Sequence, residues 1–114
     1  MRELENLKKQ VLSECRDDHV GLWSVVREVR EAFPEAGDEE VRETTLAILL
    51  ELLERRLVRA GFPTPDGRGF SSWDTEAAES IDRIDDAWIA LHRDPDIGEI
   101  VWFTALGSSM SAGG

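Results

Sequence analysis

The sequence predicts a single α+β domain, mostly helical, with about four helices and a small two- or three-stranded sheet. Apolar residues recur at helical spacing in four segments, and short runs rich in β-branched and aromatic residues follow the third and fourth of them. The chain has 114 residues, enough for one core. We therefore expect one globular domain over residues 1–106 and a flexible tail over residues 107–114, where apolar periodicity is lost.

The first three helices follow from their apolar stripes and end signals. Leu4, Leu7 and Val11 mark an amphipathic helix over residues 2–15. A second stripe predicts a helix over residues 20–33, which Pro34 ends. Asp38 is a good N-cap for the third helix, whose apolar residues wrap most of its circumference, so we expect it to be central.

A turn, a fourth helix and a strand complete the domain. The segment "FPTPDGRGF" carries a strong turn signal, and its flanks "LVRAGF" and "GFSSW" fit the strands of a hairpin. Asp74 or Thr75 caps a helix whose apolar stripe consists of Ile81, Ile84, Trp88 and Leu91. The run "EIVWFTAL" reads as a buried strand. Helices followed by a hairpin also fit a winged-helix-like arrangement.

Acidic charge is the strongest compositional signal. The chain has 24 acidic and 13 basic residues, for a net charge of −11. Residues 74–99 hold nine carboxylates against two arginines and so contribute −7 of that charge. Such a surface attracts basic proteins and repels phosphate, although it can also serve only to keep the protein soluble.

Cysteine content and hydropathy indicate a cytoplasmic protein. The single cysteine, Cys15, cannot form an internal disulfide, and we interpret it as an ordinary helix residue. The amino terminus does not resemble a signal peptide, and no apolar run is long enough to cross a bilayer, so no membrane association is expected.

The sequence offers no catalytic, metal or cofactor site. Only His19 and His92 are present, and "DDH" before residue 20 lacks a second histidine or thiolate at ligand spacing. The segment "DPDIGE" begins like a calcium loop, but Gly98 and Ala105 stand where oxygen ligands belong. The "GRG" segment is not followed by the lysine of a phosphate loop. We predict a protein that is not an enzyme.

A winged-helix DNA-binding regulator is the main alternative function. It would rely on four arginines near the end of the third helix and in the following hairpin, namely Arg55, Arg56, Arg59 and Arg68. The polar strip of the third helix is instead acidic and consists mainly of Glu40, Glu43, Glu51 and Glu54. Because phosphate contacts require cations, the sequence disfavours nucleic acid as a partner.

Four tryptophans without a tyrosine are unusual for this length. Trp88 and Trp102 fall at core positions. Trp23 lies off the stripe of its helix and Trp73 lies beside the turn, so each either covers the edge of the core or anchors an interface.

The third and fourth helices carry a resemblance to a known group of proteins. The stretch "LLERRLVRAGF", followed by "ESIDRIDDAWIALHRDPDIGEIVWF", resembles small uncharacterised bacterial proteins that occur beside toxin genes and are suspected immunity proteins. The resemblance covers about Leu46 to Phe103. The resemblance implies that the protein acts by binding a partner and does not catalyse a reaction.

Charge and resemblance together favour a non-catalytic, immunity-like or antitoxin-like module that blocks a basic partner such as a toxin. A generic adaptor that binds an unrelated protein fits the same pattern. We expect the partner to contact the acidic region 74–99, with four carboxylates and one apolar anchor as the main contacts: Glu79, Asp82, Asp85, Asp86 and Trp73. The sequence leaves the oligomeric state open.

Overall fold

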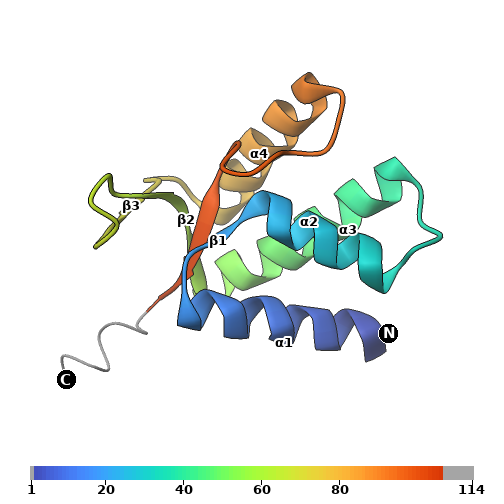
Figure 1. Cartoon of the computed structure of the whole chain (residues 1–114), viewed down its shortest axis with the longest axis horizontal. Helices are drawn as coiled ribbons and strands as arrows, with labels where there is room; N and C mark the ends of the chain where they lie inside the picture. Colours follow the sequence, from blue (N-terminus) through green and yellow to red (C-terminus); the bar gives the residue numbers. More distant parts are fainter. Residues whose placement is uncertain (1, 107–114) are drawn as a thin grey trace.

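The computed structural model describes residues 2–106, and the tail predicted over residues 107–114 lies outside them. Figure 1 shows the arrangement of the elements. They follow in the order α1 (Arg2–Asp17), β1 (Val20–Gly21), α2 (Leu22–Ala32), α3 (Asp38–Glu54), β2 (Val58–Pro63), β3 (Phe70–Ser72), α4 (Ala77–Leu91) and β4 (Trp102–Ala105). The predicted α+β, mostly helical class is confirmed.

The four strands form one antiparallel sheet in the order β1-β4-β2-β3. The last strand in the chain, β4, therefore inserts between β1 and β2. It pairs Phe103 with Val20 on one side and with Ala60 on the other. The sheet exceeds the two or three strands that the sequence predicts, because β1 is a two-residue strand that runs directly into α2.

The core lies between the sheet and the first three helices. Val25 and Val29 of α2, Ile48 and Leu49 of α3, and Phe103 of β4 are completely removed from solvent. These residues are the apolar positions that helical spacing and the strand pattern predict to be buried. Burial of apolar area drives this assembly.

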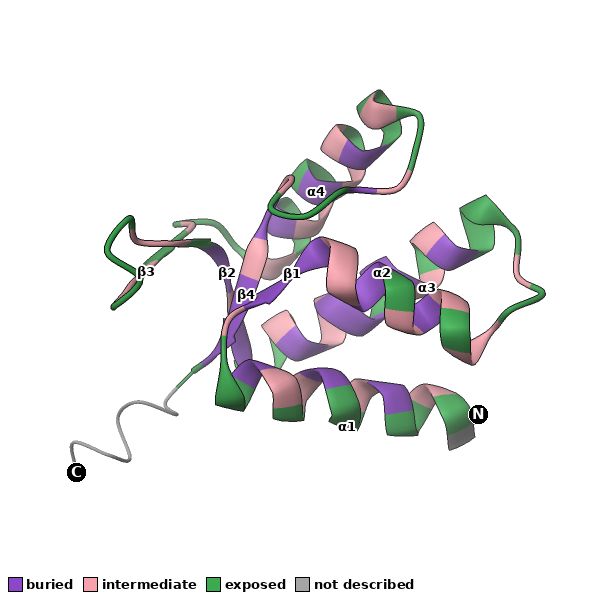
Figure 2. Cartoon of the chain, in the orientation of Figure 1, coloured by how far each residue is buried: buried purple, intermediate pink, exposed green. Residues whose placement is uncertain are grey.

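The fourth helix is attached more loosely than the others. It packs mainly on α3, and its buried residues are Ser80, Ile84 and Trp88. Figure 2 shows that most of its remaining surface is exposed, and Figure 1 places it on the side of the body opposite α1. The structure therefore presents one long face of α4 to solvent.

The β2–β3 hairpin projects from the helical body (Figure 1). Gly67, at the tip, has φ +74°, a conformation that favours glycine. Asp66 accepts hydrogen bonds from the Thr64 hydroxyl at 2.6 Å and from the Arg68 amide at 3.0 Å. Near the base, a Cβ on Gly61 would lie 2.0 Å from the Ser71 carbonyl oxygen, so only glycine allows this close approach of β3.

Three predicted helix starts differ from the structure by a few residues. The second helix begins at Leu22, because Val20 and Gly21 pair with β4. Gly37 occupies the N-cap position of α3, and Asp38 is its first helical residue. The N-cap of α4 is Glu76 in place of Asp74 or Thr75. Thr75 nevertheless contacts this helix, because its hydroxyl lies 2.6 Å from that of Ser80.

Candidate functional site

The exposed face of α4 carries three of the five residues predicted to bind a partner. Glu79, Asp82 and Asp86 are all exposed. Their spacing of three and four residues places them in one row along the helix. None of the three forms an ion pair within residues 2–106. This row, Glu79, Asp82 and Asp86, is called the α4 acidic row below.

Asp85 has a different environment. Its Oδ1 accepts a hydrogen bond from Arg42 Nε of α3 at 3.0 Å, and the two side chains are 34% and 24% exposed. The pair joins α4 to α3. Asp85 is therefore engaged within the domain and is less accessible than the acidic row.

Trp73, the predicted apolar anchor, is half-buried and packs against the core. The Arg83 guanidinium lies over its ring, with the central carbon 3.9 Å from the ring centroid. This distance is typical of a cation–π contact. One face of the indole is thus covered by α4 itself, so a partner must contact its edge or displace Arg83.

The loop between α4 and β4 uses its carboxylates internally. Asp94 accepts two hydrogen bonds from Arg30 of α2, at 2.6 and 3.0 Å. Glu99 accepts a pair from Arg93 at 2.8 and 2.9 Å, which lowers the pKa of Glu99 to about 2. These bonds fold the loop onto the body. The dense negative charge of residues 74–99 therefore separates into structural carboxylates and exposed ones.

An exposed isoleucine extends the α4 acidic row. Ile89 is 49% exposed and follows Asp82 by seven residues and Asp86 by three, so all three lie on the same side of the helix. Sequence reasoning did not select Ile89. The signal was present, because Ile89 is outside the apolar stripe that periodicity assigns to the core.

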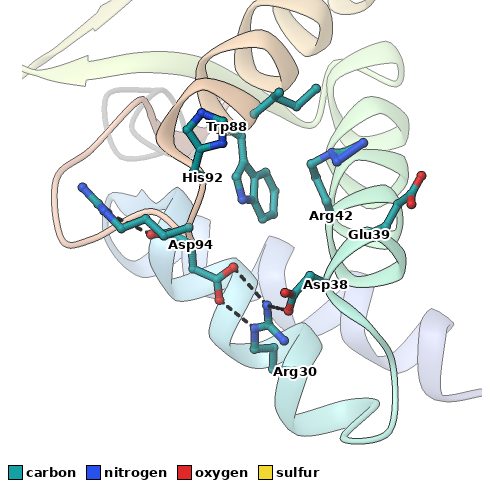
Figure 3. Close-up of a pocket in the computed structure, with 9 residues that line it drawn as sticks. Arg30, Asp38, Glu39, Arg42, Trp88, His92 and Asp94 are labelled. Atoms are coloured by element: carbon teal, nitrogen blue, oxygen red, sulfur yellow. Dashed lines mark hydrogen bonds and ion pairs between the residues drawn. The ribbon is translucent and has the colours of Figure 1, made fainter.

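A cavity of about 620 Å³ opens beside Ile89, between α4 and the ends of α2 and α3. Figure 3 shows its walls, with the Trp88 indole between His92 on one side and Arg42 on the other. Arg30 closes one end and bonds both Asp94 and Asp38. His92 ends α4 with φ +59°, which points the chain into the loop.

A second cleft of about 670 Å³ lies on the other side of the Arg30–Asp94 pair. Trp23 and Pro34 contribute apolar walls. Ile97, 76% exposed, stands at its rim. Trp23 also packs edge-on against Trp102 at the start of β4, with ring centroids 4.8 Å apart.

The groups with the most perturbed ionisation lie between α1 and α2. Burial raises the pKa of the Cys15 thiol to about 12, which keeps it protonated and unreactive. Burial and the adjacent Glu14 carboxylate raise the pKa of Glu28 to about 8. Glu28 Oε1 is buried without a hydrogen-bond partner in residues 2–106. Within those residues, no group of three or more histidines, cysteines or carboxylates is placed to hold a metal ion.

Comparisons with family models, curated proteins and solved structures find no match to this chain. In the part of the chain that the structure describes, no helix has the length and apolarity needed to span a membrane.

Proposed function

We propose that this protein is a non-catalytic, acidic protein-binding module of the immunity or antitoxin kind, which acts in the cytoplasm and blocks a basic partner. One observation carries the proposal. Several carboxylates of region 74–99 are paired within the domain, whereas the α4 acidic row is exposed and has no ion pair among residues 2–106. Glu79 lies in the first turn of α4, where a carboxylate favours the helix dipole, but Asp82 and Asp86 lie beyond that turn.

The α4 acidic row has an energetic reason to bind cations. Like charges three and four residues apart on a helix repel one another, by roughly 0.2–0.5 kcal/mol per pair. A basic partner removes this repulsion and gains attraction to each carboxylate. Complementary charge also accelerates encounter and fixes the orientation of the complex.

Ile89 supplies the apolar contact that an interface of this kind needs. Interfaces usually combine a desolvated apolar centre with a polar rim. Ile89 is half-exposed beside the 620 Å³ cavity, which offers space for a partner side chain against Trp88. We assign it as the principal apolar anchor, with Trp73 at the other end of α4 as a second contact.

The DNA-binding alternative receives less support from the surface of α3. Glu40, Glu43 and Glu54 are exposed on this helix. Arg55, which a DNA-binding surface would use, instead contacts Glu51 at 3.4 Å. A recognition surface needs cations and amides at these positions.

Affinity capture with three matched baits tests the proposal. The first bait is the wild-type domain, and the second replaces Glu79, Asp82 and Asp86 with glutamine, asparagine and asparagine. The control bait replaces Glu40, Glu43 and Glu54 with glutamine, which removes the same charge from α3. Each bait is incubated with lysate of the host at low salt and eluted with a salt gradient.

We expect one basic protein to bind the wild-type and control baits, to leave at high salt, and to be lost from the α4 variant. Equal capture by all three baits contradicts the assignment of the site. Recovery of duplex DNA without a protein contradicts the proposed function and favours the winged-helix alternative.

A further inference from the structure

A third cavity, of about 360 Å³, lies beneath the β2–β3 hairpin, between the hairpin and the carboxyl end of α1. Three arginines line it, and each comes from a different element: Arg16 from α1, Arg59 from β2 and Arg68 from the hairpin turn. The concentration of arginines is unexpected in a chain of net charge −11. None of the proposed partner contacts on α4 lines this cavity.

The three arginines have no carboxylate partner. No ion pair joins Arg16, Arg59 or Arg68 to an acidic group within residues 2–106. Elsewhere on the same domain, Arg30, Arg42 and Arg93 are each paired with an aspartate or glutamate. Guanidinium groups that line one cavity without ion-pair partners repel one another, so an anion from solution stabilises the arrangement.

One of the three guanidiniums, that of Arg59, has an aromatic contact. The Arg59 guanidinium lies 5.4 Å from the centroid of the Phe70 ring, and His19 packs edge-on against the same ring at 5.1 Å. Phe70 belongs to β3, which pairs with β2 next to Gly61. The aromatic rings form an apolar wall beside the charged groups.

A threonine hydroxyl also lies at the cavity. Thr104 pairs with Arg59 across the sheet, is 8% exposed and lines the cavity. Its side chain has no hydrogen bond to any residue that the structure describes. The hydroxyl can therefore donate a hydrogen bond to a ligand with acceptor oxygens.

Two carboxylates also border the cavity and limit its positive charge. Asp17 and Asp18 lie at the end of α1 and in the following loop. Asp18 already accepts a hydrogen bond from the His19 amide at 2.7 Å. Three guanidiniums outnumber these two carboxylates, and both aspartates are exposed.

We propose that this cavity binds a small phosphate-bearing ligand, of the size of a mononucleotide. A phosphate group offers several acceptor oxygens and about two negative charges, which match three guanidiniums and the Thr104 hydroxyl. The Phe70 and His19 rings contact the rest of the ligand. A volume of 360 Å³ lies at the lower end of small-molecule pockets. This proposal is independent of the partner-binding function.

Titration followed by NMR or calorimetry tests the site, with AMP as the probe and adenosine as the phosphate-free control. Arg16→Gln and Arg68→Gln remove exposed guanidiniums, and Thr104→Val removes the hydroxyl with little change of shape. Arg27→Gln is the matched control, because Arg27 is also exposed and unpaired within residues 2–106 but lines a different cleft. Circular dichroism establishes that each variant is folded.

We expect AMP to bind and adenosine not to bind. Each of the three cavity variants weakens AMP binding by about tenfold or more, whereas Arg27→Gln has no effect. Inorganic phosphate competes with AMP. If AMP and inorganic phosphate bind with comparable affinity, the site is assigned to free phosphate. If AMP binds much more tightly than phosphate, the site is assigned to a nucleotide.

Three results overturn the proposal. The first is no binding of AMP or phosphate to the folded wild-type domain. The second is equal affinity in the cavity variants and the wild type. The third is binding of a single-stranded oligonucleotide without binding of AMP or phosphate, which would replace the small ligand with a nucleic acid.

Discussion

Asp82, Asp85 and Asp86 lie within two turns of one helix, yet the structure gives them different roles. Asp85 is bonded to Arg42, whereas Asp82 and Asp86 belong to the exposed acidic row. Replacing each in turn with alanine separates structural charge from functional charge. Alanine brings the same gain in helix propensity at all three positions, so the difference between the variants isolates the ion pair.

The magnitude follows from the geometry. Arg42 Nε and Asp85 Oδ1 are 3.0 Å apart, in side chains about one quarter and one third exposed. A hydrogen bond between charged groups contributes about 1.5–3 kcal/mol when buried, and an exposed ion pair contributes about 0.2–1 kcal/mol. We take about 1 kcal/mol for this intermediate case. Loss of the repulsion between neighbouring carboxylates raises the free energy of unfolding of Asp82→Ala and Asp86→Ala by roughly 0.2–0.5 kcal/mol.

Asp85→Ala should therefore be less stable than Asp82→Ala or Asp86→Ala by about 1–1.5 kcal/mol, or about 5 °C in Tm for a domain of this size. Urea and thermal denaturation at pH 7, followed by circular dichroism, measure the difference. A loss of stability in Asp82→Ala or Asp86→Ala as large as that in Asp85→Ala would contradict this difference, because the acidic row would then be structural.

Three further predictions concern groups away from the α4 acidic row. Because the folded domain raises the pKa of Glu28 to about 8, ionisation of this carboxyl group destabilises the fold. The effect is absent below about pH 4.5 and grows as the pH rises to about 8. Glu28→Gln should therefore raise the free energy of unfolding at pH 8 by on the order of 1 kcal/mol, after allowance for the partial exposure of Glu28. At pH 4 the substitution should have no such effect. Equal shifts of the urea midpoint at both pH values would contradict this cause. Gly61→Ala should lower the free energy of unfolding by about 2 kcal/mol or more in urea denaturation, because the alanine Cβ would lie 2.0 Å from the Ser71 carbonyl oxygen. An unchanged urea midpoint would show that the hairpin adjusts freely. Iodoacetamide should alkylate Cys15 only as the domain unfolds, since the thiol is buried with a pKa near 12, and rapid labelling of the native protein would contradict that burial.

Local patterns were sufficient to predict most of the fold. Helical periodicity located all four helices to within a few residues, and the Asp66-Gly67 pair located the hairpin turn. The strand β1 escaped prediction because two residues are too few to show alternation. Its existence depends on pairing with β4, about eighty residues further along the chain.

The candidate sites were less predictable, because they depend on contacts between distant segments. Composition identified the acidic region but did not distinguish Asp85 from its neighbours, since Arg42 is 43 residues away. The cover of Arg83 over Trp73 likewise depends on how α4 packs. The arginine cavity combines Arg16, Arg59 and Arg68, which no local motif connects.

One measurement tests the central proposal most directly. It compares the affinity of the purified partner for the wild-type domain with its affinity for the variant that lacks the α4 acidic row, across a range of salt concentrations. We expect wild-type affinity to fall steeply as salt rises, and the variant to bind roughly 100-fold more weakly at low salt with a shallower salt dependence, at about 1 kcal/mol for each lost charge. Equal affinity and equal salt dependence for the two proteins would contradict the assignment of the α4 acidic row as the binding surface.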